Sequence, residues 1–224
     1  MISVNIASIP ERKEQLINTL KSLLKQSLKP TKINVCLNNY KEIPLEHHLI
    51  NYVFSDNSLG DAGKFMFKDS GYYLTCDDDL IYPFYYIENM VKAINDFKNC
   101  IITYHARNFY SFPINSYYRS KTNKRSRCLD EEKHCEKMQF GGTGVMGFHT
   151  DIIKPPIELF KKSNMADIWI GLYADSKGVD IYCLPHSLGY IKYQIVDNTI
   201  WDNKNRNDTE ETRIVNNYFE NGIL

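Results

Sequence analysis

The sequence predicts an α/β protein in which helices cover both faces of a mostly parallel sheet. Short apolar runs rich in Val and Ile alternate with longer segments whose apolar residues recur at helical spacing. The expected order is strand, helix, strand, strand, helix, strand, helix, strand, which is typical of parallel sheets with crossover helices. A chain of 224 residues is long enough for one such domain with a well-buried core.

Each expected element rests on a local pattern. Leu16, Leu20 and Leu23 recur among polar residues and predict an amphipathic helix that follows Pro10. The expected strands are 2–7, 32–37, 50–54, 71–76, 100–105 and 179–184, and the expected helices are 10–26, 59–68, 83–97, 152–161, 166–177 and 208–219.

The balance of charge excludes a general attraction to polyanions. Lys and Arg together number 27, as do Asp and Glu, so the formal net charge is zero and nucleic acid is not an expected partner. No run of about 18 apolar residues occurs. We therefore expect a cytoplasmic protein, with membrane contact at most peripheral.

The six cysteines lie mostly in apolar, strand-like runs, so reduced thiols buried in the core are expected. Cys128, His134 and Cys135 lie in a polar segment, but their spacing is not that of a zinc knuckle and no fourth ligand is evident.

The apolar run 71–76 ends in Asp77, Asp78 and Asp79. On an extended backbone, Asp77 and Asp79 would lie on one side and Asp78 on the other. Two converging carboxylates suit Mg²⁺ or Mn²⁺, which fill their remaining positions with water and phosphate oxygens. The alternative is a solvated acidic turn or helix N-terminus before Tyr82.

Three polar segments follow expected strands: 8–12, 38–40 and 77–79. In parallel sheets the ligand crevice lies beyond the carboxyl ends of the strands. The topology therefore predicts that these segments form one site.

The segment 108–138 is irregular and basic. Its Lys and Arg residues indicate a solvated loop or hairpin, or else a lip that faces an acceptor or an anionic lipid. The run 140–148 that follows contains four glycines, but it lacks the Gly-Lys-Ser/Thr ending of a nucleotide P-loop. Glycines here would let the backbone approach a ligand or mark bulges in a strand.

The order of these features resembles the GT-A-fold nucleotide-sugar glycosyltransferases, which have a Rossmann-like sheet, and especially the small bacterial and viral enzymes of the family 2 type. The matching stretches are 7–12, 59–65, 75–79, 142–144 and 165–169. The resemblance implies one domain over 1–224, with a nucleotide-sugar half (1–106), an acceptor and catalytic half (107–200) and a C-terminal tail and helix (201–224).

The resemblance also implies roles for individual residues. The donor-binding residues would be Pro10, Arg12, Asn38, Asn39, Asp61, Lys64, Asp77 and Asp78. The acceptor side would contain Gly142, Thr143, Gly144 and Trp169, although Trp169 also suits a core position. Many members have an acidic residue that contacts the base where this chain has Asn38-Asn39, which leaves the preference for uracil open.

The implied metal is Mn²⁺ or Mg²⁺, held by Asp79 with Asp77 and His186; a structural histidine is the alternative for His186. Asp167 occupies the place of the catalytic carboxylate of inverting members. Its alternative role is a helix-capping aspartate.

The expected function is therefore metal-dependent, inverting transfer of a sugar from a nucleoside-diphosphate sugar, with UDP-sugars favoured, to a glycan acceptor such as a surface polysaccharide or a glycoprotein glycan. One alternative is a sugar nucleotidyltransferase, although 7–12 lacks the glycine-rich basic loop of those enzymes. A non-catalytic module that binds nucleotide sugars is the other.

Overall fold

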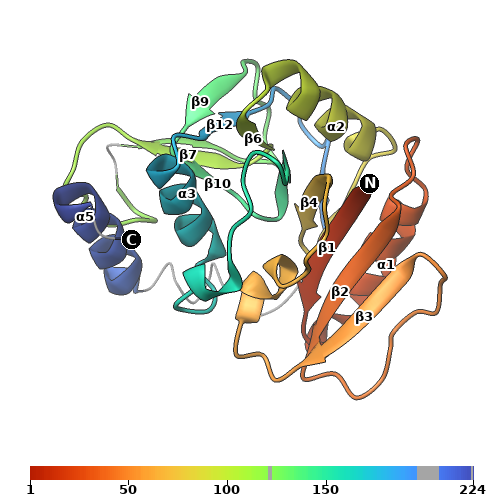
Figure 1. Cartoon of the computed structure of the whole chain (residues 1–224). Helices are drawn as coiled ribbons and strands as arrows, with labels where there is room; N and C mark the ends of the chain where they lie inside the picture. The colour runs from red at the N-terminus through yellow and green to blue at the C-terminus, as the bar shows by residue number, and fades with distance from the viewer. Residues whose placement is uncertain (121–122, 196–206, 223) are drawn as a thin grey trace.

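The computed structural model describes residues 1–120, 123–195, 207–222 and 224. An eight-stranded sheet in the order β3-β2-β1-β4-β11-β6-β12-β9 forms its centre (Figure 1). These strands are β1 (Ile2–Ser8), β2 (Lys32–Asn38), β3 (Ile50–Ser55), β4 (Tyr72–Cys76), β6 (Cys100–Thr103), β9 (Glu136–Met138), β11 (Val145–His149) and β12 (Asp180–Cys183).

The sheet is mixed, with most strands in one direction. Parallel pairs join β3 to β2, β2 to β1, β1 to β4 and β6 to β12. Strand β11 lies antiparallel between β4 and β6, and β9 is antiparallel to β12. The α/β class and the mostly parallel sheet are thus confirmed, whereas the sequence pattern did not predict a reversed central strand.

Helices cover both faces of the sheet because strand residues alternate between two cores. On one face, α1 (Lys13–Leu24) and α2 (Tyr86–Phe97) contribute to a core that also takes Leu74 from β4. On the other face, α3 (Ala166–Ser176) and α5 (Thr209–Asn221) share a core with Tyr73, the preceding residue of β4.

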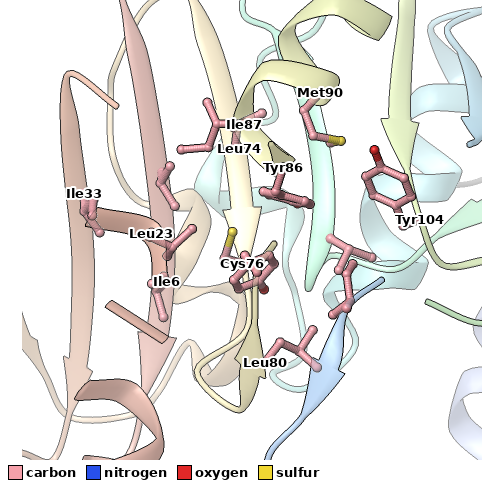
Figure 2. Close-up of a cluster of buried hydrophobic side chains, with 14 of the residues drawn as sticks. Ile6, Leu23, Ile33, Leu74, Cys76, Leu80, Tyr86, Ile87, Met90 and Tyr104 are labelled. Carbon is pink, nitrogen blue, oxygen red and sulfur yellow. The ribbon is translucent and has the colours of Figure 1, made fainter. Parts of the chain in front are cut away.

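The first of these cores contains Cys76, the last residue of β4, and Leu80, which follows the three aspartates (Figure 2). Leu23 of α1, Met90 of α2 and Ile6 of β1 are all fully buried there. This packing fixes the end of β4 against two helices, so the residues that follow it start from a rigid support.

Two expected helices are wrong. Residues 152–161 form only the short 3-10 helix η3 (Ile157–Leu159). Pro155 and Pro156 explain this result, because proline lacks the amide donor and disfavours helical geometry at the residue before it. Residues 59–68 contain the 3-10 helix η2 (Gly60–Phe65) in place of an α-helix.

The basic segment is more ordered than expected. A three-stranded sheet joins β10 (Phe140–Gly141), β7 (Ala106–Phe109) and β8 (Asn123–Ser126), and β9 adds to the main sheet. A two-stranded sheet pairs β5 (Leu80–Ile81) with β13 (Lys192–Tyr193). These elements surround the carboxyl ends of the central strands.

None of the described helices has both the length and the hydropathy that a membrane-crossing helix needs. The expected boundary at residue 106 falls where β7 begins, and the main sheet takes strands from both sides of it. Of the predicted C-terminal tail, 201–206 and 223 lie outside the described residues, whereas α5 forms where the last helix was expected.

Candidate active site

A cavity of about 720 Å³ lies at the carboxyl ends of β1, β2 and β4. It brings together most of the site residues predicted from the sequence. The predicted residues that line it are Arg12, Asn38, Asp61, Lys64, Asp77, Asp78, Asp79, Gly142, Thr143, Gly144 and Asp167. They come from positions between Arg12 and Asp167, far apart in the sequence, so the topology of the sheet brings them together.

The three consecutive aspartates divide between two cations. Asp77 forms an ion pair with Lys64, whereas one guanidinium nitrogen of Arg12 lies 3.0 Å from Asp78 and 3.2 Å from Asp79. The extended backbone expected over 77–79 does not form, so strand alternation does not decide how the three carboxylates are placed. The cause is local: β4 ends at Cys76, and the backbone turns at 78–79 in place of continuing extended.

The carboxylates are poorly compensated. Burial, followed by the charges of Asp77 and Asp78, raises the pKa of Asp79 to about 7. Burial also raises the pKa of Asp78, against the opposing effect of Arg12. Two cations facing three carboxylates leave an excess of negative charge, which a divalent cation would stabilise.

Lys64 is the cation on the other side of this cluster. Its side chain is only 2% exposed, and it lies against Asp77, which is 42% exposed. Burial alone would lower the pKa of Lys64, but the charges of Asp77 and Asp61 raise it. Lys64 therefore remains charged and holds Asp77 at the cavity wall.

Asp61 connects η2 to the start of α3. Its Oδ2 accepts a hydrogen bond of 3.1 Å from the amide of Ala166, and its own amide donates to Asn164 Oδ1 at 3.4 Å. The other oxygen, Oδ1, is buried and has no hydrogen-bond partner among the described residues. Burial raises the pKa of Asp61 to about 6. A buried acceptor that lines a cavity suits a ligand hydroxyl.

The ionised carboxylate of Asp61 should lower the free energy of unfolding at neutral pH. Because the pKa of Asp61 is higher in the folded protein, folding favours the protonated side chain. The stabilisation by this protonated form is fully present below the pKa of the unfolded chain, roughly 3.9, and is lost as the pH rises through about 6. Asp61→Asn should therefore be more stable than the wild type at pH 7, with the difference shrinking towards pH 4. Urea denaturation at both pH values measures it.

Asp56 provides the matched control, because hydrogen bonds from Ser58 lower its pKa. Asp56→Asn should show the opposite trend: the wild type gains stability over this variant as the pH rises. A stability difference for Asp61→Asn that does not vary between pH 4 and pH 7 would contradict the interpretation of Asp61.

Asp167 is held by the glycine-rich turn. Its Oδ1 accepts two hydrogen bonds of 2.8 Å, from the amide and from the hydroxyl of Thr143. The residue at the N-cap of α3 is Met165, so Asp167 does not cap its own helix. With Oδ1 engaged twice, Oδ2 is the oxygen left without a hydrogen bond to a described residue.

The glycines of this turn permit close packing around the carboxylates. A Cβ on Gly144 would lie 2.0 Å from Oδ2 of Asp77, and one on Gly142 would lie 2.8 Å from Cβ of His105. At both distances, a Cβ atom in place of glycine would force the neighbouring side chain to shift. The run 140–148 therefore forms β10, a turn and β11, with the turn pressed against the site.

Four predicted residues do not line the cavity: Pro10, Asn39, Trp169 and His186. Asn38 donates to the carbonyl of Gly60 at 3.2 Å and faces the site, whereas Asn39 is exposed. Pro10 starts the 3-10 helix η1 (Pro10–Arg12), which presents Arg12.

Trp169 and His186 have contacts typical of structural residues. Trp169 is 5% exposed in the core beneath α3, and its ring nitrogen donates to the carbonyl of Lys162 at 3.3 Å. The ring nitrogens of His186 lie 2.9 Å and 3.1 Å from the carbonyl oxygens of Leu184 and Arg127. These contacts favour a core position for Trp169 and a structural role for His186.

Several cavity residues were not predicted as site residues, among them His105, Arg107, Tyr117, Arg125, Arg127 and Asn164. His105 follows β6, so the strand-end rule could have identified it. Burial lowers the pKa of His105, while nearby Asp167 acts in the opposite direction. Arg125 and Arg127 belong to the basic segment 108–138, for which a lip that faces an acceptor or an anionic lipid was one of the alternatives, whereas Arg107 precedes that segment and carried no signal.

The donor set suits a hard divalent cation. Within 1–120, 123–195, 207–222 and 224, no three His, Cys, Asp or Glu side chains are grouped as a metal site of protein ligands alone. Mg²⁺ and Mn²⁺ do not need such a group, because one or two carboxylates suffice when substrate phosphates and water complete the coordination. Asp77 and Asp79 could supply those carboxylates.

The sequence matches no protein-family model, and no curated protein matches it.

Proposed function

We propose that the chain is a metal-dependent, inverting glycosyltransferase of the GT-A type that uses a nucleoside-diphosphate sugar, with UDP-sugars favoured. One observation carries the proposal: the carboxylates that follow β4 and the separate carboxylate of Asp167 line the same cavity at the carboxyl ends of parallel strands. The first group suits a metal bound to diphosphate, and the second suits a base for an acceptor hydroxyl.

The reaction needs two charge movements. The bond from the anomeric carbon to the diphosphate breaks, and the nucleoside diphosphate leaves with the electron pair. Mn²⁺ or Mg²⁺ held by Asp77 and Asp79 would stabilise the charge that develops on the leaving group. The acceptor oxygen forms the new bond to the anomeric carbon and gives its proton to a base. Asp167 is that base in this proposal, and Oδ2 is the oxygen that takes the proton.

Thr143 keeps Asp167 in position. Because both of its hydrogen bonds end on Oδ1, they fix the orientation of the carboxylate and leave Oδ2 for the acceptor. The nucleoside would lie at the ends of β1 and β2, where Asn38 and Asp61 offer polar groups. An acceptor such as a surface polysaccharide or a glycoprotein glycan would enter beside α3.

Arg12 should contribute to donor binding, because it neutralises Asp78 and Asp79 next to the diphosphate. Arg12→Ala should weaken UDP binding in the presence of Mn²⁺ by about 1 to 3 kcal/mol, measured by calorimetric titration. Lys13→Ala is the control, since Lys13 forms an exposed ion pair with Glu42 and does not line the cavity. Equal affinities for both variants and the wild type would exclude Arg12 from the donor site.

A panel of nucleotide sugars with Mn²⁺ tests the proposal itself. Release of nucleoside diphosphate together with a glycosylated acceptor supports it. Formation of nucleoside triphosphate from pyrophosphate indicates a nucleotidyltransferase, and binding without any product indicates a non-catalytic module. Either of these two outcomes would refute the proposed reaction.

A further inference from the structure

The small sheet next to the active site places two arginines directly opposite each other. In the antiparallel register of β7 and β8, Arg107 pairs with Arg125. Like charges in opposed positions destabilise a strand pair, whereas opposite charges stabilise it. The pairing therefore works against the stability of this sheet, and a function in binding would account for it.

A third arginine extends the pair. Arg127 lies two residues after Arg125, just beyond the end of β8. Arg107, Arg125 and Arg127 all line the same cavity as the aspartates. Lys124 directly precedes Arg125, but it forms an ion pair with Glu136 and does not line the cavity.

Within the described parts of the chain, none of the three arginines forms a salt bridge with Asp or Glu. Arg107 is 8% exposed; it donates to the carbonyl of Tyr117, and its guanidinium carbon lies 4.6 Å from the centroid of that ring. Burial, followed by the charges of Arg107 and Arg127, lowers the pKa of Arg125, so the three guanidinium groups are close enough to repel one another.

Groups of opposite charge thus line the same cavity. The aspartates that follow β4, with their partners Arg12 and Lys64, form an acidic cluster, and Arg107, Arg125 and Arg127 form a basic cluster. Asp167 also lines the cavity, and its charge acts to raise the pKa of His105 and of Tyr117, whereas the charge of Arg107 acts to lower both. Asp167 and Arg107 therefore lie near the same two side chains. A group held by the arginines would therefore be close to the proposed base.

We propose that Arg107, Arg125 and Arg127 bind a phosphate or carboxylate group of the acceptor, so that the enzyme selects anionic acceptors. The inference rests on the proposed function, because it assigns the acceptor side of the same cavity. Guanidinium groups form paired, charge-assisted hydrogen bonds with such anions. The anion can belong to a free sugar phosphate or to a lipid headgroup, and the experiment separates these sources.

The test is a calorimetric titration with inorganic phosphate, glucose 6-phosphate and uncharged glucose, with and without saturating UDP and Mn²⁺. We expect the two phosphates to bind, glucose not to bind, and UDP to leave phosphate binding intact. The double variant Arg125→Gln and Arg127→Gln should weaken phosphate binding by about tenfold or more, because each lost charged hydrogen bond has an effect of that size. Lys124→Gln, from the same strand, should bind like the wild type.

Vesicles of phosphatidylcholine with and without phosphatidylglycerol form the second arm. Binding to vesicles with phosphatidylglycerol but not to those without it, if lost in the double variant, assigns the phosphate to a lipid headgroup. Binding of glucose 6-phosphate without binding to either kind of vesicle assigns the phosphate to a soluble acceptor. Competition between phosphate and UDP would overturn the inference, because the arginines would then hold the donor diphosphate. Unchanged phosphate binding in the double variant, or none in the wild type, would also overturn it. A failure of UDP to bind would instead count against the proposed function, and the phosphate titration could still be read.

Discussion

Asp167→Asn is expected to lower the rate of sugar transfer by roughly 10²- to 10⁴-fold while the affinities for UDP and Mn²⁺ stay unchanged, because general base catalysis contributes about that much. Asn keeps an oxygen that can accept the two hydrogen bonds from Thr143, so the turn should keep its structure. Initial rates at saturating donor, together with calorimetric titration of UDP, measure both quantities.

Asp175→Asn is the matched control, because Asp175 lies on the same helix, outside the cavity, and accepts a hydrogen bond from Tyr218 at 2.7 Å. Its transfer rate should equal that of the wild type. Near-normal transfer by Asp167→Asn would require a different base, and an equal fall in UDP affinity would move Asp167 to the donor site.

Asp79→Ala is expected to abolish the increase in UDP affinity that Mn²⁺ produces in the wild type. Asp79 is proposed as the metal ligand, and the carboxylate is 13% exposed at the cavity wall, outside the hydrophobic cores. The fold should survive the change, because Arg12 retains its ion pair with Asp78. Titration of UDP with and without Mn²⁺ gives the metal dependence directly.

Asp79→Asn separates charge from volume in this experiment, since it keeps the shape of the side chain and should show the same loss of metal dependence. Asp96→Ala, on the exposed face of α2, should behave like the wild type. A metal-dependent gain in UDP affinity that persists in Asp79→Ala would remove Asp79 from the metal site.

The sequence predicted the strands of the site well, because their patterns are local. Apolar runs rich in β-branched residues located β1, β2 and β4 to within a residue or two. The rule that ligands bind beyond the carboxyl ends of parallel strands then grouped Arg12, Asn38 and Asp79 correctly.

What the sequence could not predict depends on contacts between distant segments. The antiparallel strand β11 has the apolar composition of any buried strand, and this composition does not indicate the direction in which a strand runs. The opposition of Arg107 and Arg125 depends on the register between β7 and β8, which neither run of residues determines alone. The ion pairs that divide Asp77 from Asp78 and Asp79 depend on a turn at the end of β4.

The configuration of the product at the anomeric carbon tests the central claim most directly. A base that takes the acceptor proton implies one in-line displacement, so the new glycosidic bond should have the configuration opposite to that of the donor. NMR of the product formed early in the reaction distinguishes the two anomers by their coupling constants. An inverted product is the predicted result, and a product with the donor's configuration would contradict the mechanism assigned to Asp167.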